Sequence, residues 1–136
     1  MPEGIPYAST NVIAGAGLDL NYVGNRVYAY SGGIPLNNET KTALEFQTGN
    51  KTIKAKVQHT GRFGVYGSSK NIEIIISMNN VQIIRYATST NAAHAPLDID
   101  PLHIIIPPYT AIKIEVATND TQDLDNFVTL VGRVLE

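Results

Sequence analysis

The sequence contains no cysteine, no tryptophan and only three histidines among its 136 residues. The lack of cysteine excludes disulfide bonds, thiolate zinc sites, iron–sulfur clusters and cysteine nucleophiles. Without tryptophan, the chain also lacks the largest aromatic surface on which a β-sandwich lectin can stack a sugar. The missing tryptophan weakens a carbohydrate-binding interpretation without removing it.

Charge and long apolar runs are also scarce. Charged residues make up 16% of the chain and the formal net charge is -2, against about 25% charged residues in an average globular protein. This balance gives no electrostatic reason to expect a nucleic-acid partner. The longest aliphatic runs, Ile74–Ile76 among them, are far shorter than the roughly 18 residues that span a bilayer. Residues 1–8 show no secretory signal, so we expect a soluble protein without a membrane partner, made in the cytoplasm.

The apolar residues recur at every second position, which is typical of strands with one buried and one wet face. In residues 53–57, Ile53, Ala55 and Val57 alternate with lysines, and residues 112–116 repeat the pattern. The nearly continuous apolar segment Ile72–Met78 predicts a central strand. Further strands are predicted at Arg26–Ser31, Thr42–Thr48, Val81–Tyr86, His103–Ile106 and Phe127–Leu135.

The spacing of these segments predicts the fold class. About eight short strands are separated by turn residues, and Asn79-Asn80 is suited to a tight hairpin because asparagine tolerates positive φ. No window of a dozen residues has the pattern of an amphipathic helix. We therefore predict an all-β antiparallel sandwich over residues 26–136, refined to an eight-stranded jelly roll.

Residues 1–25 form a separate region, predicted to be an extended N-terminal arm. An extended chain of that length reaches about 80 Å, and it has no core of its own. One interpretation is an extra edge strand on the same domain, and the other is an arm that binds a neighbouring subunit or partner. The candidate contacts with such a subunit or partner are its apolar residues Ile5, Tyr7, Val12, Ile13, Leu18 and Leu20.

Catalytic and metal-binding patterns are absent from the sequence. His59, His94 and His103 lie in separate segments without a hydrolase or zinc motif, and we expect them at the surface. The pair Asp98 and Asp100 lies between prolines, as in a turn. A second polar cluster is predicted to be a solvated loop and comprises Asn119, Asp120, Asp123, Asp125 and Asn126. We therefore expect no enzyme, no metal and no cofactor.

Other residues carry weaker signals. The densest basic stretch, which includes Lys54 and Lys56, is predicted to be the solvated outer face of a strand. Tyr28 and Tyr30 share a strand face, where we expect them buried or half-buried, with a sugar site or an interface as the alternatives. Val131 and Leu135 alternate out of step with the other apolar residues of the last strand and hint at burial on both of its sides.

Four segments carry a resemblance to a known class of protein. They are residues 27–32 (VYAYSG), 42–49 (TALEFQTG), 105–114 (IIPPYTAIKI) and 128–134 (VTLVGRV). In this order they resemble small β-sandwich virion proteins of tailed bacteriophages that decorate or cement the capsid. The resemblance covers residues 8–135.

The resemblance implies a structural function. Such proteins typically form homotrimers at threefold junctions of the capsid surface, so the implied partners are the major capsid protein and other copies of the chain. The alternative is a receptor- or glycan-binding head of a phage fibre or spike, using the loops Gly61–Lys70 and Thr88–Pro96. A sugar-processing jelly-roll enzyme is a third possibility.

Overall fold

A computed structural model describes residues 20–64, 70–90, 94–97, 99–120 and 124–135. Within these ranges the chain forms strands and no helix, hence no helix that is long and apolar enough to cross a membrane. The strands are β1 (Asn21–Val23), β2 (Arg26–Tyr30), β3 (Ile34–Leu36), β4 (Thr40–Gln47), β5 (Thr52–Thr60), β6 (Lys70–Met78), β7 (Val81–Thr90), β8 (Leu102–Ile106), β9 (Ala111–Thr118) and β10 (Leu124–Leu135).

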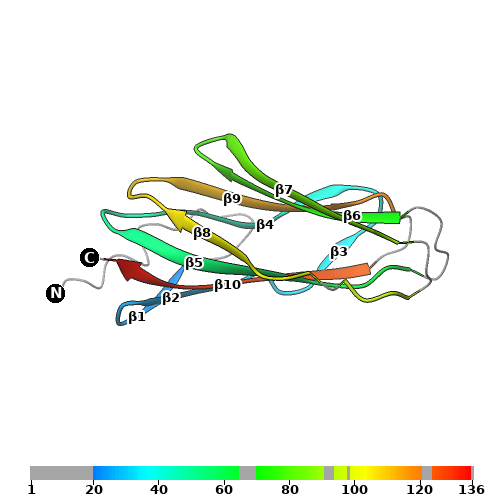
Figure 1. Cartoon of the computed structure of the whole chain (residues 1–136), viewed down its shortest axis with the longest axis horizontal. Helices are drawn as coiled ribbons and strands as arrows, with labels where there is room; N and C mark the ends of the chain where they lie inside the picture. The colour runs from blue at the N-terminus through cyan, green and yellow to red at the C-terminus, as the bar shows by residue number, and fades with distance from the viewer. Residues whose placement is uncertain (1–19, 65–69, 91–93, 98, 121–123, 136) are drawn as a thin grey trace.

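The strands form the two layers of a β-sandwich (Figure 1). The first sheet has the order β1-β2-β10-β5-β8, with β3 paired to the beginning of β10, and the second has the order β4-β9-β6-β7. Among the eight longer strands, every connection crosses from one sheet to the other except the β6–β7 hairpin. Without the short strands β1 and β3, the sheets have the orders β2-β10-β5-β8 and β4-β9-β6-β7, which are those of a jelly roll. The predicted all-β fold class is confirmed.

The strands predicted from alternation are present, and several extend beyond the predicted bounds. Asn79 and Asn80 have φ values of 51° and 67° at the turn between β6 and β7, as expected for the hairpin. β6 lies between β9 and β7, and Ile74, Ile75 and Ile76 are all buried, as predicted for a central strand. β3 was missed, because three residues are too few for a readable alternation and it contains a proline. β1, at the sheet edge beside β2, agrees with the interpretation of residues 1–25 as an extra edge strand.

The core lies between the sheets and consists of the inward residues of both. Its largest fully buried side chains include Phe46, Leu44, Ile53, Ile74 and Ile114. A smaller cluster of Phe63, Ile72, Leu97 and Ile99 closes one end. Each buried side chain of this size contributes about 1.5–3 kcal/mol of transfer free energy, so the apolar alternation supplies the driving force for the fold.

The described chain begins inside the sandwich. Leu20 is fully buried in the main core cluster, and Asn21–Val23 pair with β2 as strand β1. The end of the segment predicted as an arm therefore belongs to the first sheet. Because the Leu20 side chain is enclosed by its own domain, it is not accessible to a partner. Ile5, Tyr7, Val12, Ile13 and Leu18 lie outside the described residues.

The contact between β10 and β5 is unusually close at Gly132. A Cβ atom at this position would lie 2.5 Å from the carbonyl oxygen of Lys54 and 3.0 Å from the Cα atom of Ala55. Only glycine fits so near to a neighbouring backbone. Gly132 thus fixes the register that places the outward residues of β10 beside those of β5.

Candidate interaction surface

His59 is buried, so the prediction of a surface position for this histidine was wrong. Its Nε2 atom lies 2.9 Å from the Oδ1 atom of Asn126, and its side chain is on the core side of β5. The Nδ2 atom of Asn126 donates to the carbonyl oxygen of Leu124, which turns Oδ1 toward the imidazole. Since Oδ1 can only accept, Nε2 carries the proton. The pair therefore ties β5 to β10, whereas His94 and His103 are exposed.

Burial lowers the pKa of His59 from its ordinary value of 6.5, because the charged imidazolium loses hydration, and the hydrogen bond to Asn126 opposes this only in part. In the unfolded chain the imidazole takes up its proton at the ordinary pKa, while in the folded chain it stays neutral to lower pH. The contribution of His59 to stability is thus complete above about pH 6.5 and falls as the pH decreases toward the lowered value.

We therefore expect the free energy of unfolding to decrease from about pH 7.5 to about pH 5, with His59 responsible for part of the decrease. His59→Gln keeps a donor for Asn126 but cannot titrate, so its stability is expected to fall less over the same range. Urea unfolding at each pH measures both proteins. An identical pH dependence for the two would contradict this assignment.

The acidic residues singled out in the sequence do not converge on a site. Asp120 is buried, and its Oδ2 atom accepts a hydrogen bond from the backbone nitrogen of Gly64 at 2.9 Å. Asn119 accepts from the backbone of Asn71, and Asn126 pairs with His59. Asp98 and Asp123 lie outside the described residues. No group of three metal-ligating side chains occurs within the described ranges. Asn119, Asp120 and Asn126 make structural contacts, and Asp125 is exposed.

A cluster of basic residues occupies the outer face of the first sheet. On β10, Arg133 lies directly opposite Arg26 of β2 and Lys54 of β5. In the adjacent row, Lys56 lies opposite His103 of β8. These five side chains are exposed and border one shallow hollow. The four cations make no ion pair with a described residue. The outward position predicted for Lys54 and Lys56 is confirmed, and we call Arg26, Lys54, Lys56 and Arg133 the basic cluster.

The two sheets differ in how their charges are balanced. The strands of the first sheet contain the four cations of the basic cluster and a single acid, Asp125, near the other end of β10. The strands of the second sheet contain four basic and three acidic residues. Two ion pairs form among these residues of the second sheet, Arg85 with Glu73 at 2.7 Å and Lys113 with Glu115 at 3.8 Å. Like charges directly opposite one another destabilise a sheet, so the basic cluster is the electrostatically unfavourable face.

Apolar side chains surround the basic cluster. Tyr28 and Tyr30 on β2 are 42% and 53% exposed, so the expectation that they are buried or half-buried was wrong. They point outward because their neighbours Val27 and Ala29 occupy the core side of a regular strand. Val23 and Ile105, at the two ends of the row that holds Arg26, Arg133 and Lys54, are also exposed. Val131 and Leu135 are half-buried.

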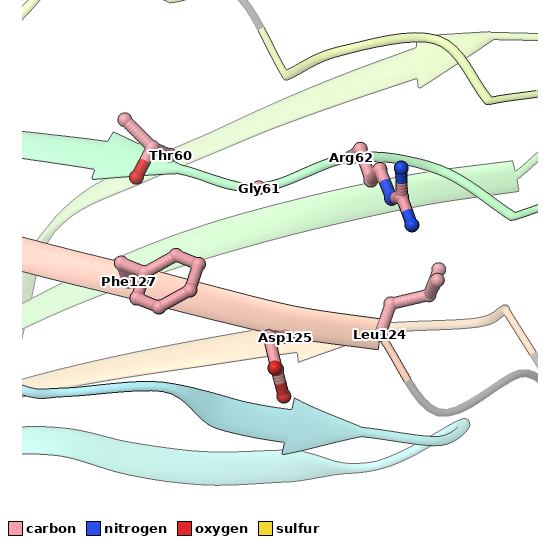
Figure 2. Close-up of a pocket in the computed structure, with 6 residues that line it drawn as sticks. All are labelled: Thr60, Gly61, Arg62, Leu124, Asp125 and Phe127. Atoms are coloured by element: carbon pink, nitrogen blue, oxygen red, sulfur yellow. The ribbon is translucent and has the colours of Figure 1, made fainter.

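A second hollow lies at the other end of the first sheet, where β5 ends and β10 begins. Figure 2 shows the residues that line it, Thr60, Gly61, Arg62, Leu124, Asp125 and Phe127. They combine one cation, one carboxylate, a hydroxyl and an aromatic ring on a small area. Such a combination offers both hydrogen bonds and a stacking face to a polar ligand.

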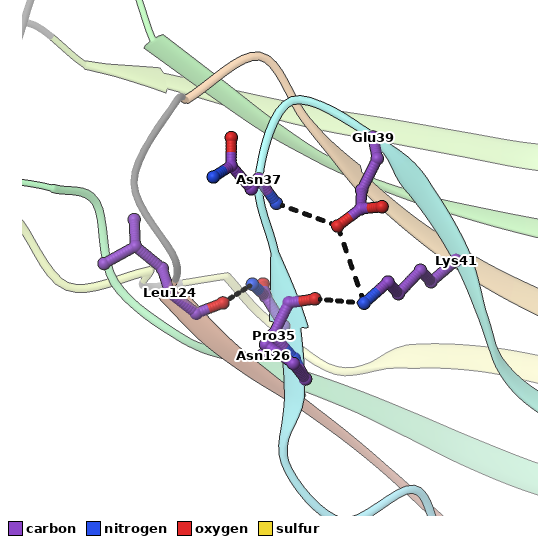
Figure 3. A network of polar contacts seen from close by, with 6 residues as sticks. All are labelled: Pro35, Asn37, Glu39, Lys41, Leu124 and Asn126. Carbon is purple, nitrogen blue, oxygen red and sulfur yellow. Dashed lines mark hydrogen bonds and ion pairs between the residues drawn. The ribbon is translucent and has the colours of Figure 1, made fainter.

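A polar network lies next to Leu124, one of the residues that line this hollow (Figure 3). The Nζ atom of Lys41 donates to the carbonyl oxygen of Pro35 at 2.8 Å and lies 3.5 Å from a carboxylate oxygen of Glu39. The backbone nitrogen of Asn37 donates to the same carboxylate oxygen. These contacts fix β3 against β4, while β3 pairs with the first residues of β10.

The sequence matches no protein-family profile and no curated protein. Among solved structures, the chain is similar to one from infectious bursal disease virus strain Gx, with a TM-score of 0.50 and 15% identity over 88% of this chain and 36% of that one. Similar chains occur in the T13 particle of the same virus, at a TM-score of 0.47 and 13% identity over 90% and 35%, and in its VP2 subviral particle, at 0.43 and 12% over 83% and 34%.

These similarities concern the fold. At a TM-score of 0.50 and 15% identity, the likeness to the chain from strain Gx shows a shared β-sandwich fold. The chain spans about a third of the length of the viral chains that it matches.

Proposed function

We propose that the chain is a structural virion protein that decorates and cements the capsid of a tailed phage, acting as a homotrimer at the junctions between capsomers. Its partners would be the major capsid protein and two further copies of itself. The proposal rests mainly on the basic cluster with its exposed tyrosines, because these residues form a surface that lacks compensation within the described chain. The likeness of the fold to a chain of a viral particle supports it.

The basic cluster fits an acidic protein surface. Arg133 has a cation on each side, and this arrangement disfavours the isolated sheet unless carboxylates of a partner neutralise it. Solubility alone does not require such a face, since the second sheet remains solvated with charges of both signs. Arginine and tyrosine are also the residues enriched in the centres of protein interfaces.

A protein partner explains the surface better than a nucleic acid does. The whole chain carries a formal charge of -2, which opposes the approach of a polyanion. Exposed Val23 and Ile105 bracket the cations, and aliphatic side chains gain more from a protein surface than from a phosphate backbone. The basic cluster is therefore assigned to the capsid-facing side of the trimer.

Neutralising the cluster is expected to weaken attachment to capsids. In R133Q/K54Q two adjacent cations become neutral, and we expect at least a tenfold increase in the concentration needed for half-saturation of undecorated capsids from the same phage. The salt dependence of binding should also decrease. Cosedimentation at two salt concentrations measures both effects.

The control is K70Q/K113Q, which makes the same change in net charge on the second sheet and leaves the Lys41 network intact. It is expected to bind as the unaltered protein does. Equal losses in the two double variants would mean that net charge, and not this face, governs attachment.

The residues before Leu20 are proposed as a second contact, made by Ile5, Tyr7, Val12, Ile13 and Leu18. Burying these five side chains, at about 1.5–3 kcal/mol each, would offset part of the cost of ordering the segment. A truncation has to end at residue 18, because Leu20 and β1 belong to the sandwich.

Deletion of residues 2–18 is expected to abolish stable attachment to capsids while leaving the urea midpoint of the sandwich within experimental error of the full chain. Attachment is measured by cosedimentation and folding by circular dichroism. The contribution assigned to the arm is refuted if the truncated protein binds as tightly as the full chain.

A glycan-binding head of a phage fibre or spike is the second candidate function, and the hollow around Phe127 is the observation that favours it (Figure 2). Phe127 could stack on a sugar ring while Asp125, Arg62 and Thr60 hydrogen-bond its hydroxyl groups. Two of the lining residues, Gly61 and Arg62, lie in a loop expected to carry specificity in such a head.

A glycan array separates the two functions. If the chain is a receptor-binding head, it should retain specific sugars, and D125N and F127A should each lose them. If it is a capsid cement, we expect no specific signal on the array, and both variants should still attach to capsids.

A further inference from the structure

The four edges of the two sheets are not equally protected against pairing with another chain. β1 is only three residues long, and β8 has five residues between Pro101 and Pro107. β4 carries a bulge after Thr42 and the charged residues Lys41 and Glu45. Short strands, prolines, bulges and charges are the features that prevent edge-to-edge association. Only β7 lacks most of them.

β7 is a long and nearly uncharged edge. It has ten residues and no proline, and its single charge, Arg85, is paired with Glu73 of β6. A bulge lies beside Ile83, close to the hairpin, and leaves Ile84–Thr90 in unbroken register with β6. An exposed edge of this kind is a template for an additional strand.

The core side of β7 is only partly covered by the described residues, since Ile84 packs against the main core but Tyr86 is exposed. Tyr86 lies directly opposite Ile74, and Ile84 opposite Ile76, so these side chains share the face that points between the sheets. Ile74 and Ile76 are fully buried, but Tyr86 is 43% exposed. Val81 and Ile83, near the hairpin, are exposed as well. Within the described part of the chain, no further strand covers these apolar side chains at this margin.

We propose that the edge of β7 accepts, as an added antiparallel or parallel strand, residues 4–18 of a second copy of this chain. The proposal rests on the proposed function, which assigns the arm to contacts with other subunits, and it names the site where the arm binds. Residues 4–18 contain no charged side chain and include Ile5, Tyr7, Val12 and Ile13. They match an edge whose one charge is already paired. The 19 residues before Leu20 span about 60 Å when extended.

The position of the arm favours a neighbouring copy over its own sandwich. The arm enters the fold at Leu20, next to β1, and Figure 1 shows β1 and β7 at opposite margins of the molecule. A donor segment at one margin and an acceptor edge at the other make a head-to-tail contact. Such contacts close into rings when the rotation permits, which suits a trimer.

Disulfide trapping tests this assignment, because the natural chain has no cysteine. Donor chains carry Ala8→Cys, Thr10→Cys or Ala14→Cys, which sample different registers, and acceptor chains carry Ala87→Cys on β7. Because each chain has one cysteine, a donor–acceptor disulfide must join two chains. The donor is labelled with ¹⁵N, the chains are mixed and mildly oxidised, and linked peptides are identified by mass spectrometry. We expect the best donor to link to Cys at position 87 in at least a fivefold excess over a control acceptor, Gln47→Cys on the β4 edge.

Three outcomes would overturn the proposal. The first is equal linkage of the donors to both edges, and the second is no linkage from any donor. The third is a main product of acceptor–acceptor disulfides, which would mean that β7 pairs with β7 of another chain. A chain that carries both Thr10→Cys and Ala87→Cys tests the remaining occupant, since a disulfide confined to one chain would mean that the arm covers its own β7. Capsid attachment is assayed separately. Linkage without attachment would contradict the cement function and support the strand exchange. Attachment without linkage would support the cement function and contradict the strand exchange.

Discussion

The pairing of β10 with β5 is the interaction on which the rest of the structure depends. Nine consecutive residue pairs join the two strands, and β10 also pairs with β2 and β3. The absence of a side chain at Gly132 permits the close contact between the two backbones. The same register brings His59 to Asn126 on the core side and Arg133 to Lys54 on the outer side. One strand pair therefore determines both the interior polar contact and the candidate attachment surface.

The two outer faces of the sandwich differ in how their charged side chains are paired. The second sheet neutralises its charges internally, through pairs such as Arg85 with Glu73. The first sheet leaves Arg26, Arg133 and Lys54 in one row with no acid among them. The edge strands differ as well, since β8 is flanked by prolines, whereas β7 has no proline and no described strand on its outer side. The basic cluster underlies the proposed contact with an acidic partner, and the edge of β7 underlies the proposed contact with a second copy of the chain.

The fold could be predicted from the sequence because the strands alternate cleanly. Ile53, Ala55 and Val57 face the core and the intervening lysines face solvent, as a period of two requires. The asparagine hairpin followed from local chemistry in the same way. β3 could not be found, since three residues give no periodicity and its partner, β10, lies far along the chain. β1 pairs with the neighbouring strand β2, in line with the interpretation of residues 1–25 as an extra edge strand.

The candidate site depended on pairing between distant segments, and the sequence alone could not supply that pairing. Arg26 and Arg133 are 107 positions apart, and only the β2–β10 register places them side by side. Lys54 and Lys56 gave the one local signal, through their alternation. The burial of His59 was missed because its partner, Asn126, lies on another strand. Tyr28 is exposed because Val27 and Ala29 face the core. The sequence of β2 has apolar or aromatic residues on both of its sides, so it did not show which side would be buried.

The most direct test of this account is the mass of the protein in solution, because a chain with an open β7 edge and a donor arm should assemble with itself. Native mass spectrometry at micromolar concentration is expected to give about 44 kDa, three times the 14.7 kDa of one chain. A mass of 14.7 kDa across that concentration range would contradict the trimer and, with it, the assignment of the arm to a neighbouring subunit.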